Sequence, residues 1–388
     1  MKARLGILTG GGDVPPLNAV LSGAKARARA LNADLVGFVK GWEGVLKDDS
    51  VDLSSLPISP RAGGTVLKSS RLNLGRIPGG PDAVLASLRK NRIIGLVVIG
   101  GEDTLANAFA VRSFPQVLIS KTIDNDVGTI GPGEDEVFNY FTLGFPTAAQ
   151  KIASFVSLGE GLRTTAYSHE RIIVVESMGM HAGWLALASG LGHPDFIVIP
   201  EYPLDYPLFL DRVIRAYRAR KNVIIVVAEG ARWADGSDLC SEADEDGAIA
   251  HPRFGGAAAA LMKRMKEDLA PNFDVRNVNA VNPSYLYRSG APSPLDLRWA
   301  RRLGEKAVSL LSGQPKETSF LAIQKTPSGF RLRNERLSRF GSIDELHRFV
   351  DNRFYDPREF RITAKGKAYL NPIVREIPQD DSYGIRPR

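Results

Sequence analysis

Short apolar runs recur along the chain, and several of them end in glycine. Residues 92–99 are almost entirely apolar, as expected for a parallel strand that is covered on both faces. Similar runs occupy residues 5–9, 34–40, 116–120, 171–176, 196–199 and 222–228. Segments with helical spacing separate them, at residues 17–31, 105–112, 145–158, 184–189 and 207–220. This alternation predicts an α/β protein with two doubly wound sheets that face one cleft.

Composition narrows the function classes. The 388 residues are 44% hydrophobic and carry a formal charge of +7, which suits anionic small molecules. No basic tail indicates nucleic acid, and no apolar run is long enough to span a bilayer, so neither a nucleic acid nor a membrane is an expected partner. The single cysteine, Cys240, cannot form an internal disulfide. We expect a cytoplasmic protein.

In the C-terminal part, residues 330–333 are predicted as a strand and residues 343–350 as a helix.

Two glycine-containing segments have a composition that suits phosphate binding. Residues 10–13 precede a helix, so their bare backbone and the helix N-terminus suit a phosphate, although a tight structural turn is the alternative. Residues 61–71 combine glycines, hydroxyls and cations, which also suit phosphate, but a charged surface loop has the same composition.

The turn at residues 100–104 carries two acids, Glu102 and Asp103. Paired carboxylates that face a phosphate are unfavourable unless a divalent cation lies between them, so we expect magnesium here. Capping of the following helix is the alternative reading.

The stretch from Lys121 to Asp126 follows the apolar residues 116–120 and should emerge at a strand's carboxyl end. Asp124 and Asp126 beside a lysine and a threonine hydroxyl could supply a general base and a charge clamp. A solvated turn is the alternative, since Asp-Asn-Asp is also good turn chemistry.

Seven motifs occur in one order within residues 5–312. They are residues 10–13, 63–65, 100–104, 121–126, 178–184, 228–230 and 283–288. In this set and order the chain resembles the phosphofructokinase family. The resemblance implies two Rossmann-like domains and transfer of a phosphoryl group to the 1-hydroxyl of fructose 6-phosphate. It further implies a donor and magnesium domain at residues 1–135 and about 287–345, and a sugar-phosphate domain at residues 136–286 and about 346–388.

The resemblance also assigns site residues. Asp124 is the implied base, with Lys121 and Asp103 as the other catalytic residues and Glu102 as the magnesium ligand. The implied donor residues are Gly12, Arg71, Asp103 and Lys121. Those implied for the sugar phosphate are Thr122, Ile123, Asp124, Asp126, Met178, Gly179, Met180, Glu229, Tyr285 and Arg288. Arg171 matches an arginine that family members lend across a subunit interface, so a homodimer or homotetramer is expected.

Asp103 decides the expected donor. ATP-dependent members typically have glycine there, whereas pyrophosphate-dependent members resemble this chain and typically also have lysine at the position of Lys121. An added carboxylate would crowd and repel a third phosphate. The chain is therefore predicted to use inorganic pyrophosphate, although Lys121 also has counterparts in some ATP-dependent members.

Three residues depart from the family pattern: Glu102 replaces aspartate, Met180 replaces arginine and Ser120 replaces proline. These departures leave open another acceptor, such as sedoheptulose 7-phosphate. Two further alternatives remain, an ATP-dependent kinase and a catalytically silent homologue that binds phosphosugars.

Overall fold

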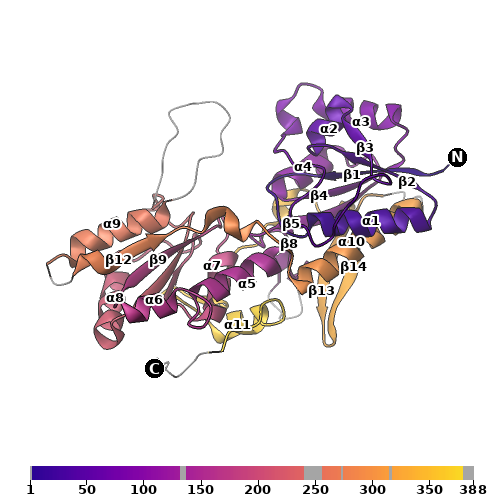
Figure 1. Cartoon of the computed structure of the whole chain (residues 1–388). Coiled ribbons are helices and arrows are strands. Elements are labelled where there is room, and N and C mark those ends of the chain that lie inside the picture. Colours follow the sequence, from indigo (N-terminus) through magenta and orange to yellow (C-terminus); the bar gives the residue numbers. More distant parts are fainter. Residues whose placement is uncertain (1, 132–136, 240–255, 272–273, 314–316, 379–388) are drawn as a thin grey trace. The chain divides into compact units, whose positions relative to one another are not determined.

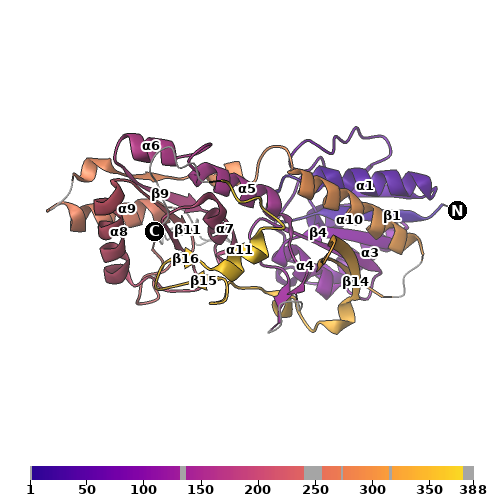
Figure 2. The same cartoon turned by 90° about the horizontal axis from the view of Figure 1, so that it is seen from below.

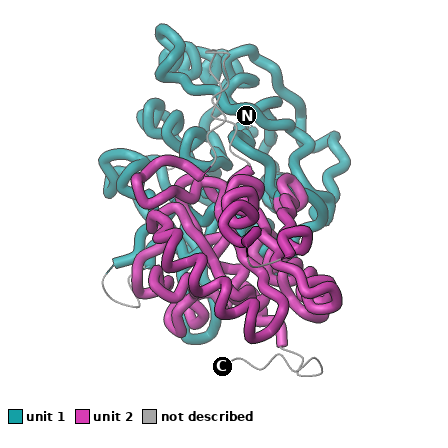
Figure 3. Tube along the Cα trace, turned by 90° about the vertical axis from the view of Figure 1, so that its left-hand side faces the viewer, with its two compact units in different colours: residues 1–147, 288–348 teal, residues 148–287, 349–388 magenta. Residues whose placement is uncertain are grey.

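The computed structural model describes residues 2–131, 137–239, 256–271, 274–313 and 317–378. Cys240 lies outside these residues. The chain forms two compact units, each built from two separate stretches. Unit 1 comprises residues 1–147 and 288–348, and unit 2 comprises residues 148–287 and 349–388 (Figure 3).

The core of unit 1 is an eight-stranded sheet with the order β14-β13-β5-β4-β1-β2-β3, and β8 (Leu143–Gly144) pairs with β5. Its parallel strands are β1 (Arg4–Thr9), β2 (Asp34–Phe38), β4 (Gly95–Gly100), β5 (Gln116–Thr122) and β13 (Ser319–Thr326). The edge strands β3 (Ser50–Asp52) and β14 (Gly329–Arg336) are antiparallel to their neighbours. Because β1, β4 and β5 run parallel, the loops that follow them leave at the same sheet edge.

Helices cover both faces of this sheet (Figures 1 and 2). On one face lie α1 (Leu17–Ala30) and α10 (Pro294–Ser312), which pack against each other. On the other lie α2 (Trp42–Lys47), α3 (Gly80–Lys90) and α4 (Glu102–Ala110). The second face has a continuous core in which alternate strand residues, such as Leu96 and Val98, meet Leu88 and Leu105 from the helices. This two-sided burial explains why the strands read as unbroken apolar runs.

Unit 2 contains a four-stranded parallel sheet in the order β10-β11-β9-β12. The strands are β9 (Ile172–Ser177), β10 (Phe196–Val198), β11 (Val223–Ala228) and β12 (Val278–Val281). One face packs on α8 (Tyr206–Arg220) and α9 (Ala257–Leu269). The unit also contains α6 (Arg163–Ser168), α7 (Trp184–Ala188) and α11 (Ala364–Leu370), and α5 (Phe145–Val156) leads into it. Both sheets confirm the predicted α/β fold class.

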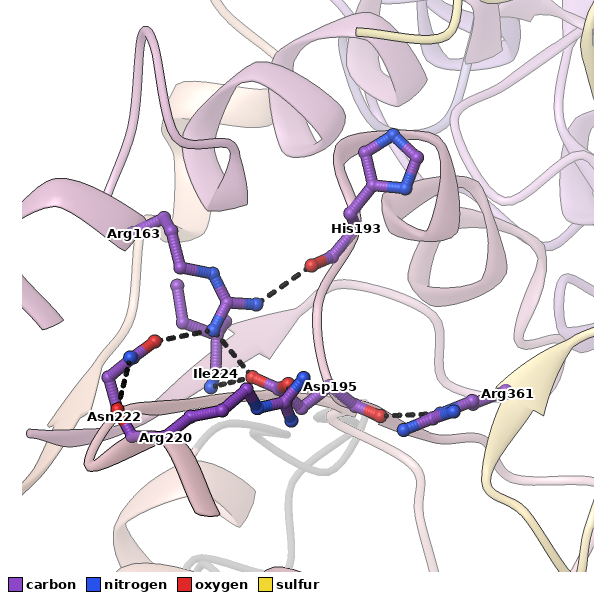
Figure 4. Close-up of polar contacts among 7 residues, drawn as sticks. All are labelled: Arg163, His193, Asp195, Arg220, Asn222, Ile224 and Arg361. Atoms are coloured by element: carbon purple, nitrogen blue, oxygen red, sulfur yellow. Dashed lines mark hydrogen bonds and ion pairs between the residues drawn. The ribbon is translucent and has the colours of Figure 1, made fainter. Parts of the chain in front are cut away.

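A buried carboxylate, Asp195, ties the turn before β10 to neighbouring segments (Figure 4). Its Oδ2 accepts hydrogen bonds from Arg163 Nη1 at 2.6 Å and from the backbone N–H of Ile224 at 2.7 Å. Its Oδ1 accepts from Arg220 Nη2, and Arg163 also donates to Asn222 Oδ1 at 3.0 Å. Two guanidinium groups and one backbone N–H therefore offset the free-energy cost of burying the Asp195 carboxylate.

Asp195→Asn should lower the stability of unit 2 by about 2–3 kcal/mol, because the amide keeps the shape but loses two charge-assisted hydrogen bonds. Urea unfolding measures the change. Asp211→Asn is the matched control, since Asp211 pairs with Arg215 at an exposed helix position and should matter by less than about 0.5 kcal/mol. Equal shifts in the two variants would contradict a stabilising role for the Asp195 network.

The apolar runs and most of the helical spacings correspond to strands and helices of the described chain, but the predicted helix over residues 343–350 is wrong. Only Ile343–Leu346 form a single 3₁₀ turn, and the backbone beyond it is extended. There Leu346 O accepts from Gly128 N at 2.7 Å, and Arg348 N donates to Asp126 O at 2.7 Å. Pairing with a distant loop overrides the helical spacing of Ile343, Leu346 and Val350. Within the described residues, no helix is both long and apolar enough to cross a membrane.

Candidate active site

The loop with the candidate base leaves the carboxyl end of β5. Lys121 and Thr122 still belong to the strand, so the loop itself begins at Ile123, which is fully buried. Thr122 Oγ1 accepts a hydrogen bond from Asp124 N at 3.1 Å and so shapes the start of the turn. In the described part of the chain, Asp124 Oδ1 is buried and has no hydrogen-bond partner. A buried carboxylate oxygen left without a donor is able to accept a proton from a ligand.

Asn125 holds the centre of the loop in a left-handed conformation, with φ of 55°. Its side-chain oxygen accepts from Thr142 N at 3.0 Å. The buried guanidinium of Arg348 donates to Asn125 O at 2.7 and 2.9 Å and to Asn139 O at 2.8 Å. Arg348 therefore fixes the loop that carries both aspartates. The sequence patterns did not single out this arginine, because it acts on backbone carbonyls and belongs to no motif.

The glycine turn after β1 lies against the end of β5. Gly11 has φ of 78°, which favours glycine, and its N–H donates to Ser70 O at 2.9 Å. The Lys121 ammonium donates to Gly12 O. A side chain at Gly12 would collide with the guanidinium of Arg288 and would lie 3.7 Å from that of Arg71. The structure therefore brings Gly12, Arg71 and Lys121 of the predicted donor group together, and it adds Arg288 to them.

Lys121 is 2% exposed, and its surroundings are electropositive. Burial is the largest cause that lowers the pKa of Lys121, the charges of Arg288 and Arg71 act in the same direction, and the resulting pKa is about 7. Asp13 and Asp124 oppose this shift. A cluster of cations with too little negative charge around it is suited to an anion, whose arrival would favour the protonated amine.

The two acids of the third glycine turn begin α4. Glu102 and Asp103 occupy its first turn, where negative charge is favourable. Neither is the capping residue: among the described residues the N-cap is Gly101, without a side-chain capping hydrogen bond. Glu102 is also one of three residues, with Asp126 and His347, whose ligand atoms lie within 4.8 Å of one another. Asp103 is exposed. Asp126 from the loop after β5 and Glu102 from the first turn of α4 therefore lie, with His347, in one group of side chains that could bind a metal ion.

The pKa values of Asp126 and His347 are both raised within this group, by different causes. Burial raises the pKa of Asp126, and the negative charge of Asp124 raises it further. Asp126 Oδ1 is buried and, among the described residues, accepts no hydrogen bond. A hydrogen bond to Glu102 raises the pKa of His347. A divalent cation would relieve the repulsion between these carboxylates, so the donor set fits such an ion.

In unit 2, two strand ends approach closely. Glu229 Oε1 accepts from Gly179 N at 3.1 Å, and Gly230 N donates to Gly179 O at 3.3 Å. Gly230 has no room for a side chain because it packs on Met180 O. The structure therefore gathers the predicted sugar-site residues Met178, Gly179, Met180 and Glu229 at the carboxyl ends of β9 and β11.

The remaining predicted site residues lie elsewhere. Tyr285 is 73% exposed on the 3₁₀ turn Ser284–Tyr287 of unit 2, whereas Arg288 begins the second stretch of unit 1. Arg171 precedes β9, at the opposite end of the strand from Met178, and donates to Thr165 Oγ1 at 2.6 Å. A six-residue strand separates these two ends by about 20 Å. Arg171 therefore does not join the Met178–Glu229 group of its own unit.

The carboxyl edge of the parallel sheet in unit 1 carries carboxylates, glycine turns and buried cations. Residues of these types at this edge are typical of α/β enzymes that transfer phosphoryl groups. Comparison with known proteins agrees with this class. The sequence profile described as Phosphofructokinase matches residues 4–311. The chain belongs to the phosphofructokinase family.

Relatives in this family differ in the donor that their names give. A pyrophosphate--fructose 6-phosphate 1-phosphotransferase of Dictyoglomus thermophilum is 35% identical over 329 residues, which are 83% of this chain and 90% of that protein. An ATP-dependent 6-phosphofructokinase of Corynebacterium efficiens is 36% identical over 313 residues, 79% of this chain and 85% of that protein. A solved pyrophosphate-dependent phosphofructokinase of Marinobacter aquaeolei shares the fold, with a TM-score of 0.78, 22% identity and coverage of 98% of this chain and 94% of that one. Family membership therefore leaves the donor open.

Proposed function

We propose that the protein transfers a phosphoryl group from inorganic pyrophosphate to the 1-hydroxyl of fructose 6-phosphate, reversibly and with magnesium. The observation that carries this proposal is Asp124, whose buried Oδ1 finds no hydrogen-bond donor among the described residues, at the strand edge where the glycine turns and cations converge. In the forward direction Asp124 accepts the proton of the attacking hydroxyl. The hydroxyl oxygen bonds to the transferring phosphorus as the bond to the leaving phosphate breaks.

The donor is proposed to lie against the glycine turn. Lys121, Arg71 and Arg288 supply three cations around Gly12, and a pyrophosphate has enough negative charge to satisfy them. Lys121 is proposed to neutralise charge that develops on the transferring group or on the leaving phosphate. Arg288 is proposed to bind phosphate. The family resemblance assigns it to the 6-phosphate of the sugar, and its position beside Gly12 also supports a contact on the donor side.

Asp103 supports pyrophosphate over ATP. Its carboxylate is exposed at the first turn of α4, in the same glycine turn as Glu102. A nucleotide's additional phosphate would bring like charge to this carboxylate, whereas pyrophosphate ends before it.

The magnesium requirement rests on Glu102 and Asp126. Their oxygens lie close together, and carboxylates are the ligands that magnesium prefers. When bound, the ion supplies charge neutralisation for the phosphoryl oxygens. The extra methylene of Glu102, compared with the aspartate of the family pattern, extends its carboxylate further from α4.

The sugar phosphate is proposed to bind Met178, Gly179 and Glu229, with Thr122, Ile123 and Asp126 from the base loop and Tyr285 at its 6-phosphate. The hydrogen bond from Gly179 N holds the Glu229 carboxylate in one orientation, which suits recognition of sugar hydroxyls. Arg171 is proposed to serve a neighbouring subunit, since it lies at the other end of β9. This role requires a homo-oligomer.

Asp103→Gly tests the donor assignment. The variant should gain activity with ATP, because the carboxylate that repels a third phosphate is gone. It should lose about tenfold or more in kcat/KM for pyrophosphate, because Asp103 is one of the proposed catalytic residues. Asp103→Asn is the matched control: it removes the charge but keeps the volume and so separates repulsion from crowding. Steady-state rates with both donors decide the matter. Undiminished turnover of pyrophosphate by Asp103→Gly would count against this assignment.

A panel of donors and acceptors tests the reaction itself. Pyrophosphate or ATP is combined with fructose 6-phosphate or sedoheptulose 7-phosphate and magnesium, and product formation is measured. Pyrophosphate with fructose 6-phosphate should be the fastest pair. Tight sugar-phosphate binding without turnover of any donor would identify a silent binding homologue instead, as the loss of arginine at Met180 allows.

A further inference from the structure

His347 lies in the C-terminal part of unit 1, beyond the residues 4–311 that match the family. Its imidazole Nδ1 is 3.5 Å from Glu102 Oε2, and a ligand atom of Asp126 lies within 4.8 Å of both residues' ligand atoms. Two ligands of one octahedral ion lie about 3.0 Å apart when adjacent and about 4.2 Å apart when opposite, for bonds of about 2.1 Å. The three residues are therefore spaced so that small side-chain movements would bring them onto one ion.

The backbone around His347 is held firmly. Its neighbours Leu346 and Arg348 hydrogen bond to Gly128 and Asp126 of the base loop, each at 2.7 Å. His347 itself forms an antiparallel bridge with Val127. The segment is thus paired with the loop that supplies Asp126, and the imidazole is positioned without depending on a flexible surface turn.

A second observation points to an absent ligand. Among the described residues, Asp126 Oδ1 is a buried carboxylate oxygen with no hydrogen-bond partner. Native proteins rarely leave such an atom unsatisfied, and a bound cation would satisfy it. The donor set would then be two carboxylates and one imidazole. Carboxylates suit both magnesium and manganese, whereas imidazole is a ligand of first-row transition metals and not of the hard ion magnesium.

We propose that His347 is the third protein ligand of the divalent cation held by Glu102 and Asp126, and that this site binds Mn²⁺ in preference to Mg²⁺. The proposal rests on the cation role given to Glu102 above. It does not rest on the choice of phosphoryl donor.

Mn²⁺ alone tests the proposal, without either substrate. Electron paramagnetic resonance measures free and bound Mn²⁺, and pulsed spectra of the bound ion show whether a nitrogen-14 nucleus is coupled to it. The parent protein should bind Mn²⁺ with nitrogen coupling and should prefer it to Mg²⁺ in competition. His347→Gln should remove the coupling and weaken Mn²⁺ binding by about tenfold or more, with a smaller loss for Mg²⁺. His169→Gln, at an exposed histidine of unit 2, is the matched control and should change neither.

Bound Mn²⁺ without nitrogen coupling in the parent would overturn the proposal, and this result does not require a folded variant. Absence of Mn²⁺ binding, or equal losses of Mn²⁺ and Mg²⁺ affinity in His347→Gln, would also overturn it. In the second case His347 would act only through its hydrogen bond to Glu102. If the parent protein bound Mn²⁺ with nitrogen coupling but did not turn over pyrophosphate, the proposed reaction would be contradicted and the proposed metal site would not.

Discussion

Asp124→Asn should lower kcat by about 10²- to 10⁴-fold while leaving the binding of sugar phosphate almost unchanged. The amide has the shape of the carboxylate but cannot accept the hydroxyl proton. Loop geometry should persist, because Thr122, Thr142 and Arg348 hold the turn through the backbone of residue 124 and through Asn125. Steady-state kinetics, with equilibrium binding of fructose 6-phosphate measured separately, check this result.

Two comparisons make the Asp124 prediction specific. Asp126→Asn should cost less in kcat, since Asp126 is assigned to the cation and to holding substrate. Asp34→Asn, at an exposed position that begins β2, should have no effect. If Asp126→Asn proved the more damaging change while divalent-cation binding was retained, the base would have to be reassigned to Asp126.

Lys121→Met should lower kcat/KM by about 10²- to 10³-fold and make the protein more stable. The loss follows from removing a cation that meets the transferring charge. The gain follows because Lys121 is buried among Arg71 and Arg288, so that its pKa falls from 10.5 to about 7. Methionine fills a similar volume without that electrostatic cost, so the free energy of unfolding should rise by about 1–4 kcal/mol.

The sign of the pH dependence follows from the lowered pKa of Lys121. Below pH 7 the native state must hold a buried ammonium, which the unfolded chain holds at no such cost. Between about pH 7 and pH 10.5 the unfolded state binds more protons, so the stability of the parent rises with pH relative to the variant. The stability gain from Lys121→Met should therefore be largest at pH 6 and should shrink at pH 9.

Donor binding provides a second readout for Lys121. In the parent, the affinity for pyrophosphate should fall above pH 7 more steeply than in Lys121→Met, because only the parent loses a cation there. Thermal unfolding and calorimetric titration over pH 6–9 measure both effects. A variant that is less stable at every pH would show that the bond to Gly12 O outweighs the burial cost.

Sequence patterns predict the central strands of both sheets because these strands are buried on both faces. The strands β3, β12 and β13 were not predicted. Residues 116–120, for example, could only be a covered strand or a buried helix, and the run is too short for a helix. The strand continues to Thr122, however, so Lys121 lies in the sheet and not in the loop. Nothing in a lysine's neighbours along the chain reveals that its ammonium will be buried against a glycine carbonyl from another strand's turn.

The candidate site was predictable where it consists of loops at strand ends, and not where it depends on distant backbone. Gly12, Arg71 and Lys121 come together as their motifs suggest. His347 and Arg348 were missed because residues 343–350 have helical apolar spacing, while their actual conformation is set by pairing with the base loop. Such pairing leaves no local pattern, since backbone carbonyls are the same in every residue.

The attachment of Arg348 to Asn125 has a consequence for synthesis of the protein. The two residues are 223 positions apart, so Arg348 follows Asn125 out of the ribosome after roughly 10–45 s at about 5–20 residues per second. During that interval all of the first stretch of unit 2 is translated before β13 and β14 of unit 1, and the arginine follows them. The loop that carries Asp124 therefore lacks the donor for its backbone acceptors until residue 348 has been synthesised.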